Sequence, residues 1–339
     1  MSQYRIIAGL TIGAVVLLIF VGGVVRMTGS GMGCPDWPTC FGQWIPPTDI
    51  SELPADYKTQ FQVQGKEIAD FDPFKTWVEY LNRLLGVLIG LFAIATAIAG
   101  FRLKGKTFSR LRIFSGLGLA LVIIQGGIGA YVVRTDLHTG VVTLHMLIAI
   151  LIVAVLIAGF LSSYPDQTIP SLPKQLKGLG IGLLVLTLVQ IIFGTQVREA
   201  VDTVAIELGE GARGQWLAEI GSTYQIHRYF YYAVVGGLLV FSLRLRPYLD
   251  RLPGAKVLII SLLGLVLTEI LIGIGMHHFS IPPVLQPLHL MLATMIFSLE
   301  FALIGSWWVW GGNETSASLI QVEDLEKPLA PSFVKMEHS

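Results

Sequence analysis

The chain has 339 residues, of which 53% are hydrophobic and 14% charged, and its mean hydropathy is +0.68. This is more apolar material than a soluble domain can cover, which excludes an ordinary water-soluble fold and makes a lipid bilayer the expected solvent. The formal net charge is zero, so the charge balance gives no reason to expect a nucleic-acid partner.

Eight apolar runs are long enough to cross a bilayer as helices, which takes about 20 residues. The predicted spans are 6–25, 81–101, 113–133, 141–161, 176–197, 227–243, 257–276 and 287–310. No small-residue cleavage site follows the first run, so a retained helix is expected there rather than a signal peptide. The predicted fold class is an all-α polytopic membrane protein with eight transmembrane helices.

The charges between the spans predict the orientation in the membrane. Segments 102–112 and 244–256 are rich in Lys and Arg, which places them in the cytoplasm together with both termini. The loops 26–78 and 198–225 are rich in acids and are expected on the outer face. The two cysteines, Cys34 and Cys40, fall in the first outer loop, where an oxidising compartment allows a disulfide to persist.

The two halves of the sequence resemble each other at the helix ends. The matching positions are Arg26 with Arg198, Asn82 with His227, and His145 with His289. This spacing predicts two pseudo-symmetric four-helix bundles related as a parallel repeat. The expected parts are an N-terminal half, 1–162, capped by the loop 26–78, a C-terminal half, 163–310, and a polar cytoplasmic tail, 311–339.

Polar residues at the outward helix ends predict heme sites. Histidines at membrane depth are costly and usually functional, and a helical bundle can hold a heme between two facing imidazoles. Glycine-rich helix ends would leave room for the macrocycle, and arginines would bind its propionates. The candidate iron ligands are His145, His227 and His289, and the candidate propionate partners are Arg26, Arg83, Arg198 and Arg228. The alternative is that these histidines are hydrogen-bonded at the interface and that the arginines extend to the headgroups.

Glu79 lies three residues before Asn82, so both side chains share one helix face toward the first-half site. A carboxylate there could act as a base or stabilise a developing cation. The alternative is a solvated acid at the membrane boundary.

Several segments together resemble the heme A synthase family. They are GGVVRMTGSG at 22–31, CPDWPTC at 34–40, a Pro-Pro pair at 46–47 and EYLNR at 79–83. The similarity continues through the histidines named above and covers the membrane region from residue 6 to about 310.

This resemblance implies an enzyme that oxidises the C8 methyl group of heme O, through a hydroxymethyl intermediate, to the formyl group of heme A. It implies a heme b cofactor on His227 and His289, a substrate heme on His145, and a catalytic carboxylate at Glu79. The cysteine pair would lie above the substrate site, as a redox-active disulfide or as a structural link. The expected location is the inner (plasma) membrane, with the heme sites toward the outer face. The expected partners are a farnesyltransferase that supplies heme O and the cytochrome c oxidase assembly machinery, while the sequence leaves a homo-oligomer open.

Asn82 departs from the family pattern, in which many members carry histidine. Because asparagine is a poor iron ligand, we expect the substrate heme to be five-coordinate on His145, or transiently six-coordinate with water. Two other functions remain open at this point. A diheme electron-transfer protein predicts histidine pairs in both halves, and a heme carrier or insertion factor predicts reversible binding without chemistry on the macrocycle.

Overall fold

The computed structural model describes residues 1–167 and 169–310. Over these residues the chain is built from helices and loops, and eight helices are long and apolar enough to cross a membrane. The predicted class, an all-α multi-pass membrane protein with eight spans, is confirmed. The predicted tail, 311–339, lies outside the described residues.

The spanning helices agree with the predicted runs except at their ends. They are α1 (Ser2–Met27), α3 (Pro73–Phe101), α4 (Ser109–Arg134), α5 (Thr139–Leu161), α6 (Lys174–Leu208), α8 (Ser222–Leu245), α9 (Ala255–His278) and α10 (Leu285–Trp310). The loops carry two short helices, α2 (Tyr57–Gln60) and α7 (Trp216–Ile220), and the 3₁₀ turns η1 (Ile50–Glu52), η2 (Lys106–Phe108), η3 (Glu210–Gln215) and η4 (Arg246–Arg251).

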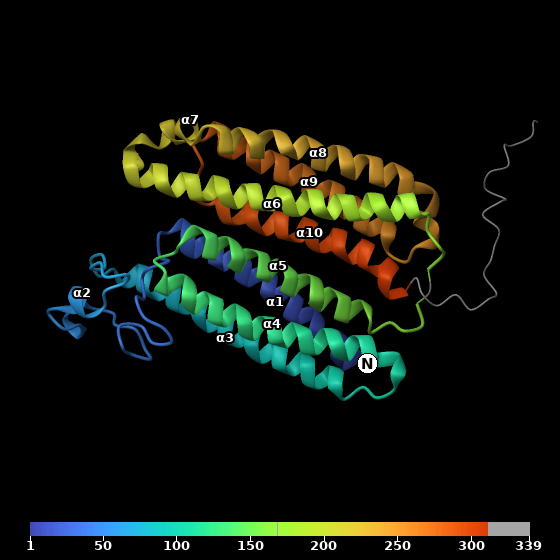
Figure 1. The fold of residues 1–339 in the computed structure, drawn as a ribbon, viewed down its shortest axis with the longest axis horizontal. Coiled ribbons are helices and arrows are strands. Elements are labelled where there is room, and N and C mark those ends of the chain that lie inside the picture. The colour runs from blue at the N-terminus through green and yellow to red at the C-terminus, as the bar shows by residue number, and fades with distance from the viewer. Residues whose placement is uncertain (168, 311–339) are drawn as a thin grey trace, which may run out of the picture.

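The helices lie side by side in two groups (Figure 1). In one group α1 packs on α3 and α5, and α4 packs on the same two helices; in the other, α8 and α10 pack on α6, and α9 packs on α10. Helix α10 also contacts α1 and α5, so it joins the groups. The division into two pseudo-symmetric four-helix bundles stays a prediction.

Polar contacts inside the first group link its helices at membrane depth. The hydroxyls of Thr11 on α1 and Thr96 on α3 lie 2.8 Å apart, and those of Tyr4 and Ser115 lie 3.0 Å apart. Lipid offers no hydrogen-bond partner, so such side chains bond across helices and specify which helices meet.

The outer loop predicted at 198–225 is largely helical. Helix α6 continues to Leu208, and α7 follows after η3. Val197, Val201 and Val204 recur at helical spacing and pack against the buried Trp216 and Ile220. The acids of this segment occupy the other faces of an amphipathic helix. Hydropathy averaged along such a segment is low, so it is predicted as a polar loop.

Helix α3 also begins earlier than predicted. The Asp72 side chain accepts a hydrogen bond from the Lys75 amide at 3.2 Å, and Pro73 occupies the first turn, which is a favourable helix start. Glu79 therefore lies in the second turn of an established helix, beneath the outer loop.

Candidate functional site

Two histidines face each other in the second helix group. The ring centroids of His227 on α8 and His289 on α10 are 6.2 Å apart, and the rings are inclined at 79°. Two nitrogens that bind one metal from opposite sides lie about 4 Å apart, at about 2 Å per bond as for imidazole on zinc, and each ring centroid lies beyond its nitrogen. The spacing therefore fits a single iron between the two imidazoles.

The rest of the coordination sphere cannot come from these side chains. Across 1–167 and 169–310, His, Cys, Asp and Glu form no group of three or more that could hold a metal ion. A metal with two protein ligands needs its other ligands from elsewhere, and a porphyrin supplies four in one plane. The donor set thus fits heme, which His227 and His289 would hold through their imidazoles.

Each candidate histidine lies against a glycine of a neighbouring helix. A Cβ atom at Gly194 would lie 3.3 Å from Cε1 of His227, one at Gly129 would lie 3.4 Å from Cε1 of His145, and one at Gly273 would lie 3.8 Å from Cε1 of His289. The glycine-rich helix ends are expected to leave room for the macrocycle. In the structure, these three glycines contact the imidazole rings. Larger residues at 129 or 194 would push these rings out of place.

A polar residue precedes each of these glycines by four positions. Gln125 Nε2 donates to the carbonyl of His145 at 3.0 Å, and Gln190 Nε2 donates to the carbonyl of His227 at 3.1 Å. Glu269 instead reaches the ring, with its Oε1 3.1 Å from Nδ1 of His289. Sequence reasoning missed this repeated unit, although a search for polar residues four positions before the repeat glycines would have found it.

The α1–α3 pair, which corresponds to α6–α8 in the repeat, lacks both the histidine and its polar support. Gly22 on α1 is preceded four positions earlier by Leu18, and α3 carries Asn82 where α8 carries His227. The Asn82 side chain is half-buried, and its Oδ1 atom is buried without a hydrogen-bond partner in the part of the chain that the structure describes. The first group therefore offers one imidazole, His145, and one uncommitted amide.

Glu79 and Arg83 fasten the outer loop to α3. The predicted disulfide between Cys34 and Cys40 is present, with both residues buried. Glu79 is 4% exposed: its Oε2 accepts from the Cys34 amide at 2.9 Å, and its Oε1 accepts from Arg83 Nη2 at 2.5 Å. The backbone of Gly33 approaches the same helix so closely that a Cβ there would lie 2.4 Å from the Lys75 carbonyl oxygen.

The Arg83 guanidinium uses all of its N–H donors in this junction. Besides Glu79, it donates to the carbonyl oxygens of Cys34 at 2.8 Å, Asp36 at 2.6 Å and Thr39 at 2.9 Å. A guanidinium has five N–H groups, so none is left for a propionate in this arrangement.

Two other predicted propionate partners meet across the halves. Arg26, near the end of α1, and Arg198 on α6 both form ion pairs with Asp202, and Arg198 also donates to the Arg26 carbonyl at 3.4 Å. Two guanidinium groups around one carboxylate leave a net positive charge. Arg228 is exposed on α8, with its guanidinium carbon 6.0 Å from the centre of the Tyr229 ring.

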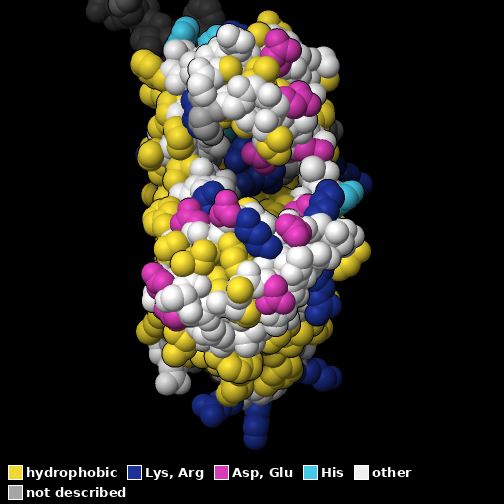
Figure 2. Space-filling model, turned by 90° about the vertical axis from the view of Figure 1, so that its left-hand side faces the viewer, with side chains coloured by type: hydrophobic (Ala, Val, Ile, Leu, Met, Phe, Trp, Pro, Cys, Tyr) yellow, Lys and Arg dark blue, Asp and Glu magenta, His cyan; other side chains and the backbone are white. Residues whose placement is uncertain are grey.

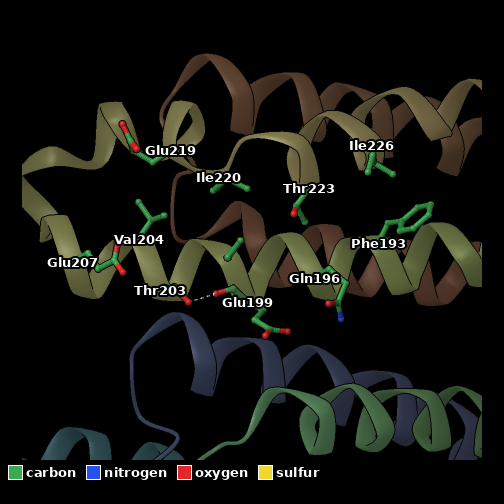
Figure 3. A pocket seen from close by; sticks show the side chains of 11 residues that line it. Phe193, Gln196, Glu199, Thr203, Val204, Glu207, Glu219, Ile220, Thr223 and Ile226 are labelled. Atoms are coloured by element: carbon green, nitrogen blue, oxygen red, sulfur yellow. Dashed lines mark hydrogen bonds between the residues drawn. The ribbon is translucent and has the colours of Figure 1, made fainter.

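The end of the molecule that carries α2 and α7 is hollowed between the two helix groups (Figure 2). Lys, Arg, Asp and Glu side chains gather around this hollow. A separate cavity of about 570 Å³ lies between α6 and the α7–α8 segment (Figure 3). Its lining includes Phe193 on α6 and Ile226 on α8.

The helices define a multi-pass membrane protein in which two histidines, His227 and His289, come together in one helix group, and His145 lies in the other. The model of the cytochrome oxidase assembly protein family (COX15-CtaA) matches residues 5–301. The chain belongs to this family.

Curated relatives support the same assignment. The chain is 29% identical over 317 residues to the heme A synthase of Brucella suis, covering 84% of each protein, and 26% identical over 294 residues to that of Sphingopyxis alaskensis, covering 77% of this chain and 79% of the relative. It is also 26% identical over 203 residues to the heme A synthase of Shewanella oneidensis, where the match covers 59% of this chain and 58% of the relative.

We expect Arg83→Gln to detach the loop 26–78 from α3. The change leaves Glu79 buried without its cation and removes donors from the loop carbonyls, and breaking a buried ion pair on one side costs about 3–5 kcal/mol. Limited proteolysis in detergent should show faster cleavage within this loop. Arg134→Gln, at an exposed residue that ends α4, is the control; equal cleavage of both variants would contradict the assignment.

Proposed function

We propose that this chain is a heme A synthase, which oxidises the C8 methyl group of heme O to the formyl group of heme A, through the hydroxymethyl form, for cytochrome c oxidase biogenesis. One observation carries the proposal beyond family membership. The second helix group presents two imidazoles 6.2 Å apart, whereas the first presents His145 with Asn82 at the position repeat-related to His227. One site suits a permanently held redox heme, and the other suits a substrate that must enter, react and leave.

In this proposal His227 and His289 hold heme b, which supplies a centre that can take up one electron at a time. The seating of His227 on Gly194 and of His289 on Gly273 keeps the two rings in place without a ligand. Both histidines are half-buried among the helices.

The substrate heme binds in the first helix group, with His145 as its iron ligand. Gln125 and Gly129 hold the backbone and the ring of this histidine from α4. Asn82 leaves the opposite face of the iron without a strong ligand, so the substrate is five-coordinate or binds water weakly. The excess positive charge of Arg26 and Arg198 over Asp202 favours the approach of propionates to the outer end of the groups.

Glu79 is the catalytic carboxylate of the proposal. The methyl-to-formyl conversion removes four electrons and adds one oxygen atom, so positive charge and protons must be handled at the reacting carbon. A carboxylate held in one orientation by Arg83 and the Cys34 amide can stabilise that charge or accept a proton. The same contacts make Glu79 part of the loop attachment, so the two roles need separate readouts.

The cellular setting completes the proposal. The enzyme lies in the inner membrane with both termini in the cytoplasm and both heme sites toward the outer face, in keeping with the basic segments 102–112 and 244–256. A farnesyltransferase supplies heme O, and the cytochrome c oxidase assembly machinery receives heme A.

The function is tested by extracting hemes from membranes of a heme O-producing host, with and without this protein, and identifying them by chromatography and mass spectrometry. We expect heme A or its hydroxymethyl precursor only with the protein. His145→Ala should abolish product while copurified heme b remains, and His289→Ala should abolish both. Unaltered heme O beside copurified heme b, in folded protein with its redox partners present, would instead support an electron-transfer protein or a carrier.

Glu79→Gln should lower product formation at least about 100-fold, as expected for loss of a general acid–base group, with heme b content unchanged. Glutamine keeps the size of the side chain and an oxygen that can accept from the Cys34 amide. The same extraction assay measures the product, and limited proteolysis reports whether the loop stays attached. Glu67→Gln, on an exposed loop residue, is the control; normal turnover in Glu79→Gln protein would refute the catalytic role.

Asn82→His should convert the substrate heme from five- to six-coordinate, because it supplies a second imidazole. The optical and electron paramagnetic resonance spectra are measured on ferric heme O bound to His289→Ala protein, in which the second site lacks its ligand pair. We expect a high-spin spectrum with Asn82 and a low-spin spectrum with histidine. A low-spin bis-histidine spectrum in the presence of Asn82 would contradict the open-face proposal.

A further inference from the structure

Each of the three candidate iron ligands is contacted by a polar side chain of a neighbouring helix. Two of these side chains are amides, and the third is a carboxylate. Residues four positions apart lie on the same face of a helix. The residue four positions before the glycine that contacts each histidine therefore also faces that histidine. This residue is Gln125 opposite His145, Gln190 opposite His227 and Glu269 opposite His289.

The two glutamines act on the backbone and leave the rings alone. Each donates its amide to the carbonyl oxygen of the histidine. The Nδ1 atoms of all three histidines are buried without a hydrogen-bond partner over 1–167 and 169–310, and that of His289 lies beside a carboxylate. An ionised Glu269 has no proton to donate to a carbonyl oxygen, and it lies against the ring instead. Its Oε1 is 3.1 Å from Nδ1 of His289, with the two side chains 16% and 24% exposed.

The chemistry of iron ligation gives this contact a direction. A neutral imidazole that binds a metal through Nε2 carries its proton on Nδ1, which is then a hydrogen-bond donor. A carboxylate that accepts this proton fixes the tautomer and the ring orientation and makes the ligand more basic. Nδ1 of His289 makes no hydrogen bond in its present orientation, although Oε1 of Glu269 lies 3.1 Å away, so a turn of the ring would complete the bond.

We infer that Glu269 is a positioning residue for His289. Its carboxylate accepts the Nδ1–H of His289 and makes His289 the more electron-donating of the two ligands of one heme. The inference rests on the proposed heme b site. A more basic ligand stabilises the ferric state, so Glu269 lowers the midpoint potential of the heme and favours the passing-on of each electron that it receives. His227, whose partner Gln190 binds the backbone, contributes no such effect.

The test compares two glutamate-to-glutamine variants of the purified holoprotein. Glu269→Gln installs the residue that stands at the two equivalent positions, so the pocket keeps its size. Glu300→Gln is the matched control, since Glu300 is also a buried carboxylate at membrane depth, on α10 about 16 Å along the helix from His289. We expect Glu269→Gln to keep a low-spin bis-histidine spectrum, to shift the heme b midpoint potential upward, and to weaken heme retention about 10- to 100-fold. Glu300→Gln should change neither quantity.

Unchanged potential and heme retention in Glu269→Gln protein would overturn the inference. A wild-type protein without heme b would overturn the proposed cofactor instead, so the two failures are distinguishable. If Glu269→Gln protein does not fold, infrared difference spectra of the wild type decide. Reduction of heme b should then shift a carboxylate band in the wild type, and Glu300→Gln protein should show the same band. Absence of this band from both proteins would equally overturn the inference.

Discussion

The arrangement of the candidate sites depends on close contact between helix pairs at their glycines. An imidazole at membrane depth needs space, an orientation and a polar neighbour, and lipid supplies none of these. Gly129, Gly194 and Gly273 let the rings lie against a neighbouring helix, and a Gln or Glu one turn earlier adds the polar contact. Binding energy is therefore not needed to order the ligands, because packing orders them in advance.

The two halves use this unit to different ends. In the second half both histidines are seated, and they face each other at a separation that suits one iron. In the first half the histidine and its polar support are replaced together, by Asn82 and Leu18. The first half therefore presents one imidazole with its polar contact, where the second half presents two.

Electrostatics at the outer end follow from the cost of leaving charge unpaired at low dielectric. Arg83 bonds Glu79 and the disulfide loop, and Arg26 and Arg198 share Asp202 across the two halves. The first junction holds the loop on α3, and the second ties α1 to α6 while retaining positive charge. Arg26, Arg83 and Arg198, predicted from the sequence as propionate partners, thus also form ion pairs within the protein.

Hydropathy, spacing and residue chemistry are local properties, so the class, the eight spans and the cysteine pair could be predicted from the sequence. It did not determine that α6 runs on to Leu208, since that helix is stabilised by contacts of its valines with Trp216. Three features could be seen only once the helices were packed. His227 lies beside His289, Arg83 has no N–H left, and Glu269 reaches a ring whereas Gln125 and Gln190 reach a backbone. These are distances between residues far apart in the chain, and they are fixed by how the helices pack rather than by the residues of any one helix.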